Sequence, residues 1–310
     1  MGSRTAIAGC CGALLFAAAC TPSGRAGKLE IVLVTKAMDS EFWLRVKHGA
    51  EAAARSSAEV RLTVLAPEKE INIDQQVTIL EDQVVKRVAA LAVAPTGLWE
   101  IVPVLERAKA AGIPVLIADT DLPWAGKRAF IGIDNRTGGK MAGAFVAQAI
   151  GGRGKVAVIS GIPGVATHAG RVAGFREEIA KSPGVECVAI QPANSDRAMA
   201  MAVMENILTL HPDLRAVFAT SGQMALGAVE AIAAKRLTGK VMLVGFDAER
   251  ESLRALQAGA LSAVIAQNPE RIGWETASAA IQAARGHPVV PWIDTGTTVI
   301  TPSNVAQFLK

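Results

Sequence analysis

Apolar and polar positions alternate along the chain in a pattern that predicts strands and helices in turn. Short apolar runs rich in β-branched residues, such as 31–35, have the length and composition of buried parallel strands. Longer stretches in which apolar residues recur every three or four positions, such as 71–85 and 101–111, are typical of amphipathic helices. Strands and helices that alternate in this way form βαβ units and hence a parallel sheet. The expected strands are 31–35, 61–66, 88–94, 114–118 and 129–133, followed by 155–160, 185–190, 216–219, 241–244 and 263–266.

This pattern predicts an α/β fold with two doubly wound parallel-sheet lobes, because the second series of strands and helices repeats the first. A chain of 310 residues is also longer than one ordinary hydrophobic core accommodates. In an open parallel sheet, small ligands bind at the carboxyl ends of the strands. Two such lobes that face each other would border one cleft, so we expect a binding site there.

The first residues have the layout of an export signal. Arg4 supplies a positive charge, residues 7–19 form an apolar run too short to span a bilayer comfortably, and small residues precede Cys20. This arrangement resembles the lipobox of bacterial lipoproteins, in which the cysteine is lipidated and becomes the new amino terminus. We therefore expect a signal peptide at residues 1–19 and a lipidated tether at 20–27. The folded protein would then be held in the periplasm or at the cell surface through Cys20.

Composition narrows the possible functions. Hydrophobic residues make up 51% of the chain and charged residues 19%, yet no apolar run after the signal is long enough for a transmembrane helix. The formal net charge of +4 falls to +3 when Arg4 is removed with the signal, and the basic residues form no cluster. This charge distribution argues against a nucleic-acid partner.

Cysteine and histidine usage gives no sign of a metal site, a cofactor or a disulfide. After Cys20, the chain has one cysteine, Cys187, and its strand-like surroundings predict a buried thiol. No cysteines or histidines have the spacing of metal ligands. The histidines are scattered at His48, His168, His211 and His287.

Polar or aromatic side chains follow most of the expected strands. After the first strand, Ser40 lies in a turn that can cap a helix carrying the adjacent rings Phe42 and Trp43. Taken alone, each such residue has an ordinary role as a helix cap, turn or core residue. Together they could bind a sugar, because carboxylates and guanidinium groups bond paired hydroxyls and flat rings cover the apolar faces of a pyranose or furanose. The other candidates after strands are Asp119, Thr120, Arg171, Ser221, Asp247 and Gln267.

From Leu29 to the C-terminus, the sequence resembles the periplasmic sugar-binding proteins of the ribose-binding type, which are the substrate-binding components of ABC transporters. Ordered matches over this length identify a family far better than they identify a ligand. The resemblance implies a binding protein rather than an enzyme. The most specific matching segments are 191–193, 196–197, 211–213, 216–219, 224–228, 244–247, 265–267 and 272–273.

The resemblance also assigns ligand positions one at a time. Ser40 and Ser221 stand where the ribose binders have asparagine, Thr120 where they have arginine, and Ser195 where they have phenylalanine. Losing an arginine and a ring removes a charge-assisted donor and a wall of the pocket, which points to a polyol or a sugar other than ribose. Trp124 could supply replacement surface or belong to the core, and both interpretations stay open. The family's expected chemistry is kept at Phe42, Trp43, Asp119, Arg171, Asp247 and Gln267.

By resemblance, the chain crosses between the lobes near 133–135, near Gln267 and near 294–296, so the lobes could rotate about a three-segment hinge and close over a ligand. The implied partners are an ABC permease and its ATPase, and the protein itself would be a monomer. The implied boundaries are 28–133 plus 267–294 for the N-terminal lobe and 134–266 plus 295–310 for the C-terminal lobe.

Several other functions are less consistent with the sequence. The glycine-rich turn at 161–164 follows an expected strand, but it lacks the G-x-G-x-x-G pattern of a nucleotide-binding enzyme. Hydrolase motifs G-x-S-x-G and H-E-x-x-H do not occur, and no helix-turn-helix precedes the first strand as it would in a transcription repressor. The alternative that stays open is a receptor that reports a sugar-like autoinducer or chemoattractant to a membrane sensor.

Overall fold

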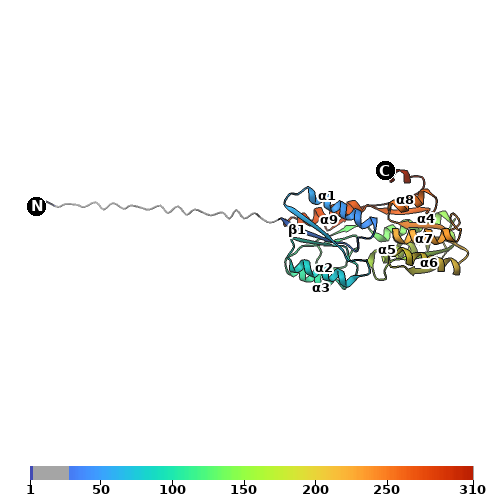
Figure 1. Ribbon diagram of the computed structural model, residues 1–310, viewed down its shortest axis with the longest axis horizontal. Helices are drawn as coiled ribbons and strands as arrows, with labels where there is room; N and C mark the ends of the chain where they lie inside the picture. Colours follow the sequence, from blue (N-terminus) through green and yellow to red (C-terminus); the bar gives the residue numbers. More distant parts are fainter. Residues whose placement is uncertain (3–27, 310) are drawn as a thin grey trace.

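The computed structural model describes residues 1–2 and 28–309. Within this range the chain forms two lobes, each built on one sheet of six strands, and the lobes lie side by side along the long axis of the molecule (Figure 1). The predicted lipidation site Cys20, the tether, and all but the first two residues of the predicted signal peptide lie outside the described residues. In the described part of the chain, no helix combines the length and the apolar character needed to cross a membrane.

The first lobe contains a wholly parallel sheet in the order β11-β5-β4-β3-β1-β2. Alternate residues of β1 point to opposite faces, so Ile31 and Leu33 enter one core while Val32 and Val34 enter another. The first core is completed by helices α1 and α9, and the second by α2 and α3. The elements are β1 (Leu29–Val34), α1 (Glu41–Arg55), β2 (Val60–Leu65), α2 (Ile73–Val85), β3 (Ala90–Val93), α3 (Val102–Ala110), β4 (Val115–Ala118), β5 (Ala129–Gly132), α9 (Pro269–Ala284) and β11 (Trp292–Asp294).

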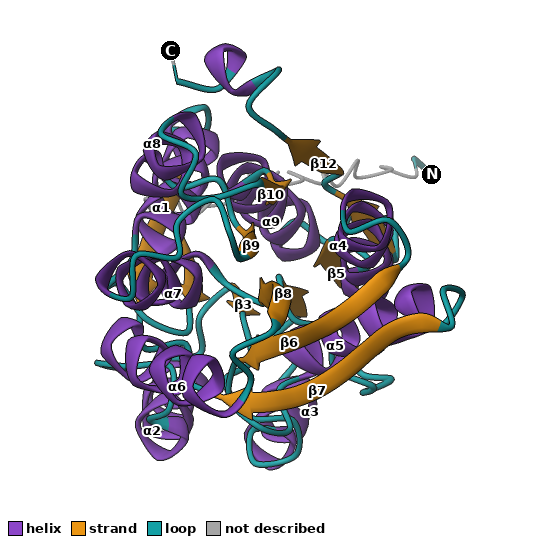
Figure 2. Ribbon diagram, turned by 90° about the vertical axis from the view of Figure 1, so that its right-hand side faces the viewer, coloured by secondary structure: helices purple, strands orange, loops and turns teal. Residues whose placement is uncertain are grey.

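The second lobe repeats this arrangement with the strand order β12-β10-β9-β8-β6-β7, in which β12 alone runs antiparallel to its neighbour. Helices α4 and α5 cover one face, and α6, α7 and α8 cover the other. Figure 2 shows β6 and β7 as two long neighbouring strands of this sheet. The elements are α4 (Asn135–Ala149), β6 (Arg153–Ser160), α5 (Ala166–Ile179), β7 (Gly184–Pro192), α6 (Arg197–Leu210), β8 (Leu214–Ala219), α7 (Gly222–Ala234), β9 (Met242–Phe246), α8 (Arg250–Gln257), β10 (Ala263–Gln267), β12 (Thr297–Ile300) and the short 3₁₀ helix η1 (Val305–Gln307).

The predicted α/β class and all ten expected strands are confirmed, with ends that differ by up to two residues. Strands β11 and β12 were not expected from the sequence. Because β11 belongs to the first sheet and β12 to the second, the chain passes between the sheets after β5, after β10 and after β11. The exact lobe boundaries stay a prediction. The expectation of a buried thiol is wrong for Cys187, which is only half buried on β7.

Helices α4 and α5 approach each other closely where glycines face the partner backbone. A Cβ on Gly174 would lie 1.9 Å from the carbonyl oxygen of Arg136, and one on Gly139 would lie 2.0 Å from that of Arg171. Neither backbone can yield without separating the helices. This contact therefore fixes the position of α5 relative to α4, and with it the position of Arg171 within the lobe.

We expect Gly174→Ala to lower the free energy of unfolding by about 1–3 kcal/mol, the usual cost of forcing extra volume into a packed contact. Urea-induced unfolding followed by circular dichroism would measure the loss. Gly170→Ala on the same helix is the matched control, because a Cβ there would come no closer than 3.2 Å to any atom outside its own helix, and its nearest backbone neighbour, the Arg136 nitrogen, would lie at 3.5 Å. Equal stability of the two variants would contradict this account of the α4–α5 contact.

Candidate functional site

A cavity of about 330 Å³ lies between the lobes, at the carboxyl ends of both sheets. Both lobes contribute to its lining. The first lobe supplies Asp39, Ser40, Phe42, Trp43, Lys69, Glu70 and Ile71, and the second supplies Asn194, Ser195, Asp196, Met199, Ser221, Gly222, Gln223, Asp247 and Glu249.

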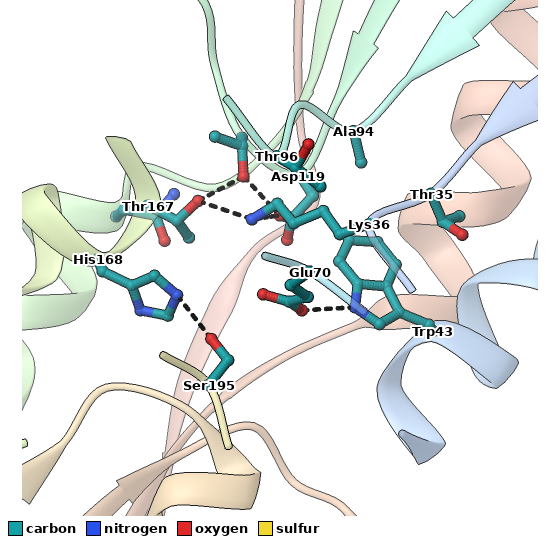
Figure 3. Close-up of polar contacts among 12 residues, drawn as sticks. Thr35, Lys36, Trp43, Glu70, Ala94, Thr96, Asp119, Thr167, His168 and Ser195 are labelled. Atoms are coloured by element: carbon teal, nitrogen blue, oxygen red, sulfur yellow. Dashed lines mark hydrogen bonds and ion pairs between the residues drawn. The ribbon is translucent and has the colours of Figure 1, made fainter. Parts of the chain in front are cut away.

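The start of α1 places two rings on the cavity wall. Phe42 and Trp43 meet edge to face, with ring centroids 4.9 Å apart and planes at 84°. Both rings are buried in the first-lobe core, yet both also line the cavity, so the core role and the candidate binding role apply together. Trp43 Nε1 donates a 2.8 Å hydrogen bond to Glu70 Oε1 (Figure 3), which fixes the orientation of the indole. Ser40 occupies the N-cap position but makes no side-chain cap bond, so its hydroxyl is available to the cavity.

Asp119 and Asp247 occupy equivalent positions in the two lobes. Asp119 follows β4 and its amide donates to Ile131 on β5, while Asp247 follows β9 and its amide donates to Ile265 on β10. Both backbones are left-handed, with φ of 58° and 69°, a conformation that costs a non-glycine residue of order 1 kcal/mol or more. Each strand-to-strand bond holds this strained turn, and each turn directs a carboxylate toward the space between the lobes.

Lys36 connects Asp119 to the opposite lobe. Its ammonium lies 3.3 Å from Asp119 Oδ2 and donates to Thr167 Oγ1 of α5 at 3.4 Å. The Thr120 hydroxyl donates to Asp119 Oδ2 at 2.8 Å and also contacts the Thr167 hydroxyl. Lys36 is only 3% exposed, so burial keeps this ion pair from being screened by water. The sequence analysis missed Lys36, although its place directly after an apolar strand was a usable signal.

Arg171 is held within the second lobe rather than on the cavity wall. Its Nε donates to Asn135 Oδ1 at 2.8 Å, its Nη1 donates to the Thr220 carbonyl at 2.7 Å, and its guanidinium stacks 3.5 Å above the Phe246 ring. Burial lowers the pKa of Arg171, although Asp247 and two more distant carboxylates oppose the shift. Through these two hydrogen bonds, Arg171 joins the start of α4 to the end of β8.

Asp247 is buried and faces the cavity. Only one of its two carboxylate oxygens accepts a hydrogen bond from a described residue. Its Oδ1 accepts from Gln267 Nε2 at 2.8 Å, whereas its Oδ2 lies 4.0 Å from Arg171 Nη1. Burial raises the pKa of Asp247, and Arg171 and Gln267 counteract part of this shift.

His168 and Glu249 also belong to this region, and the sequence analysis identified neither. The imidazole of His168 lies 3.0 Å from the Thr220 hydroxyl. Its other nitrogen lies 3.2 Å from the Ser195 hydroxyl (Figure 3). Burial, with the nearby charges of Lys36 and Arg171, holds its pKa well below the usual value, so the ring is neutral. Glu249 is 5% exposed and accepts from Gln223 Nε2 at 2.8 Å, and burial with the charge of Asp247 raises its pKa to about 7.

The structure divides the ten residues predicted for the site into two groups. Ser40, Phe42, Trp43, Ser195, Ser221 and Asp247 line the cavity. Asp119, Thr120, Arg171 and Gln267 lie behind that lining, where they are buried and bonded to neighbouring side chains or backbone. Trp124 belongs to the core of the first lobe, where its indole donates to Glu106 at 2.5 Å, and it is absent from the cavity wall. Across the described residues, no group of three or more histidine, cysteine, aspartate or glutamate side chains is arranged to hold a metal ion.

Two doubly wound lobes with one shared cleft define a two-lobe protein that binds small ligands at the carboxyl ends of its strands. Comparison with known proteins agrees with this class. Residues 31–288 match the family described as periplasmic binding protein domain. The ribose import binding protein of Bacillus subtilis (strain 168) is 34% identical over 268 residues, which cover 86% of this chain and 85% of that protein.

Solved structures give the same result. A periplasmic solute-binding protein of an ABC transporter from Actinobacillus succinogenes 130z, with bound D-allose, has a TM-score of 0.85 and 30% identity, covering 90% of this chain and all (100%) of that chain. A solute-binding protein from Agrobacterium vitis, with bound D-fucose, has a TM-score of 0.87 and 30% identity, covering 89% and 96% of the two chains. The chain therefore belongs to the periplasmic binding protein family, and its relatives include the ribose-binding type named above.

Glu249 generates a prediction about stability and pH. The unfolded chain loses this proton near pH 4.5 and the folded protein near pH 7, so the folded state binds the extra proton in between and stability falls as pH rises across that range. The full loss is about 3.5 kcal/mol at about 1.4 kcal/mol per pH unit. We expect Glu249→Gln to unfold at higher urea concentration than the parent at pH 8 and at the same concentration near pH 4.5.

Glu251→Gln is the control, because the pKa of Glu251 is shifted in the opposite direction. Arg197 lowers the pKa of Glu251, so that variant should gain nothing at pH 8. A Glu249→Gln protein no more stable than the parent at pH 8 would show that the buried carboxyl carries no ionisation penalty.

Proposed function

We propose that this protein is the substrate-binding lipoprotein of an ABC importer and that it binds a monosaccharide or polyol in the cleft by hinge closure. The observation that carries the proposal is a single cavity with two aromatic rings on one lobe and a buried carboxylate on the other. Rings cover the apolar face of a sugar, and a carboxylate accepts from its hydroxyls. The relatives named above are ribose-import and solute-binding proteins, two of them solved with D-allose and D-fucose, which favours an importer over a signalling receptor.

Closure follows from how the lobes touch. On one side of the cavity, Lys36 and Thr120 contact Thr167. On the other side, the Arg250 amide donates to Glu41 Oε2 at 2.8 Å. Contacts on both sides of the cavity support the closure part of the proposal, in which the three chain crossings serve as the hinge segments. A ligand that touches both walls stabilises the closed form over the open one, which is the condition for ligand-driven closure.

The periplasmic location follows the family, and the anchor follows the sequence signal at Cys20. A lipid on Cys20 would keep the protein at the membrane surface, where a permease can recognise its closed form. One lipid-modified cysteine with a short tether leaves the two lobes free to open and close. The proposed protein works as a monomer, because one chain supplies both walls of the cavity.

Binding by Asp247 can be tested with a panel of sugars. We expect isothermal titration calorimetry with D-ribose, D-allose, D-fucose and myo-inositol to give binding by at least one member. Asp247→Ala should weaken that binding by about tenfold to a hundredfold, because a hydrogen bond to a charged group contributes roughly 1.5–3 kcal/mol. Asp213→Ala removes an exposed carboxylate that pairs with Lys155 far from the cavity, and it should bind like the parent. Unchanged affinity of the Asp247→Ala variant would show that Asp247 does not bind the ligand.

The anchor has its own test. We expect Cys20→Ser, expressed in a bacterial host with its native leader, to move from the membrane fraction to the soluble fraction, because the hydroxyl cannot accept the lipid. Mass spectrometry of the parent should show a lipid mass on Cys20. Cys187→Ser is the matched control and should stay with the membrane. A parent protein that is soluble and unmodified would refute the lipoprotein part of the proposal.

A further inference from the structure

The ionisable side chains that line the cavity are mostly acidic. They comprise five carboxylates and one lysine: Asp39, Glu70, Asp196, Asp247, Glu249 and Lys69. Asp196 caps α6 through the Met199 amide, and Asp39 and Lys69 lie at the exposed rim. The charged groups that face the interior are therefore Glu70 from the first lobe and Asp247 and Glu249 from the second.

These inner carboxylates keep acceptor capacity that the described residues do not use. Asp247 is 7% exposed, and no described residue donates a hydrogen bond to its Oδ2. Glu70 Oε1 accepts from the Trp43 indole, and its Oε2 receives no hydrogen bond from any other residue that the structure describes. A carboxylate oxygen at the cavity wall that receives no hydrogen bond can still accept one, so the cavity favours a ligand that brings donors.

The two buried cations of the region make their hydrogen bonds outside the cavity, although Arg171 Nη1 also lies 4.0 Å from Asp247 Oδ2. Lys36 pairs with Asp119 and bonds Thr167, and Arg171 bonds Asn135 and the Thr220 carbonyl. Neither side chain forms part of the cavity lining. The imidazole of His168 is neutral for the reasons given above and adds no positive charge.

The inner carboxylates also disfavour one another's ionisation. Burial and the charge of Asp247 raise the pKa of Glu249. Burial also raises the pKa of Asp247, an effect to which Asp119 and Glu70 add and which Arg171 and Gln267 oppose. The Glu70 and Asp247 carboxylates line the same cavity from opposite lobes, so like charges border the space that a ligand would fill. A positive charge placed between them would relieve the repulsion and form charge-assisted hydrogen bonds, which are about twice as strong as neutral ones.

We propose that the cleft selects a hydroxyl-rich ligand that carries an ammonium group, such as an amino sugar, with the ammonium held between Glu70 and the pair Asp247 and Glu249. This inference rests on the proposed function, since it names the class of sugar for the same site. The rings of Phe42 and Trp43 border the same space, and aromatic faces attract cations as well as sugar C–H groups.

The test compares sugars that differ only in charge. Calorimetry at neutral pH and low salt would titrate D-glucosamine, D-glucose and N-acetyl-D-glucosamine, and the corresponding set built on D-galactose. At least one free amine should bind ten times or more tightly than its neutral parent, and acetylation of that amine should abolish the gain. Glu70→Gln should reduce the amine-to-parent ratio at least fivefold. Glu68→Gln, an exposed carboxylate on the same loop and outside the cavity lining, should leave the ratio unchanged.

The outcomes separate this inference from the proposed function. Binding of a neutral sugar from either panel with equal or weaker binding of every amine would overturn the charge preference and leave the sugar-binding function intact. No binding by any neutral or amino sugar would overturn both. An amine preference that persists in Glu70→Gln and in Glu249→Gln would overturn the placement of the ammonium.

Discussion

The structure depends on one geometric constraint, which is that two parallel sheets present their carboxyl ends to each other. In a parallel sheet every strand leaves its polar turn at the same edge, so a lobe gathers its turns there whatever the turns contain. When two such edges face each other, they enclose a cavity whose walls come from both lobes. The equivalent left-handed turns at Asp119 and Asp247 show how closely the second lobe repeats the first.

Charge is distributed unevenly around this cavity. The buried cations Lys36 and Arg171 are used to hold the protein together, one across the lobes and one within the second lobe. The carboxylates of Glu70, Asp247 and Glu249 are left at the cavity wall. Removing charges from water is costly unless each finds a partner. The cations are paired within the scaffold, whereas each acid accepts from one neighbouring side chain and still borders the cavity.

Much of the site followed from local sequence, and the reasons differ between residues. Phe42, Trp43, Ser221 and Asp247 each come directly after a strand or at the start of a helix, so strand periodicity alone places them at the correct edge. Strands β11 and β12 escaped notice because they are largely exposed and carry no buried apolar run, unlike the equally short β3, β4 and β5, and their pairing is set by distant strands. The half-buried state of Cys187 has a similar cause, since β7 lies at an edge of its sheet.

The α/β class, the ten expected strands, the two lobes and the chemical types at the strand ends could all be predicted from the sequence, because they follow from the pattern of apolar residues over short windows. Only the tertiary structure decided which of those side chains reach the cavity. It placed Asp119 and Arg171 behind the wall, brought Glu70 and Glu249 to it, and put Trp124 in the core. The physical reason is that burial and charge pairing join residues far apart in the chain, as Lys36 is joined to Thr167, and no local pattern encodes such contacts.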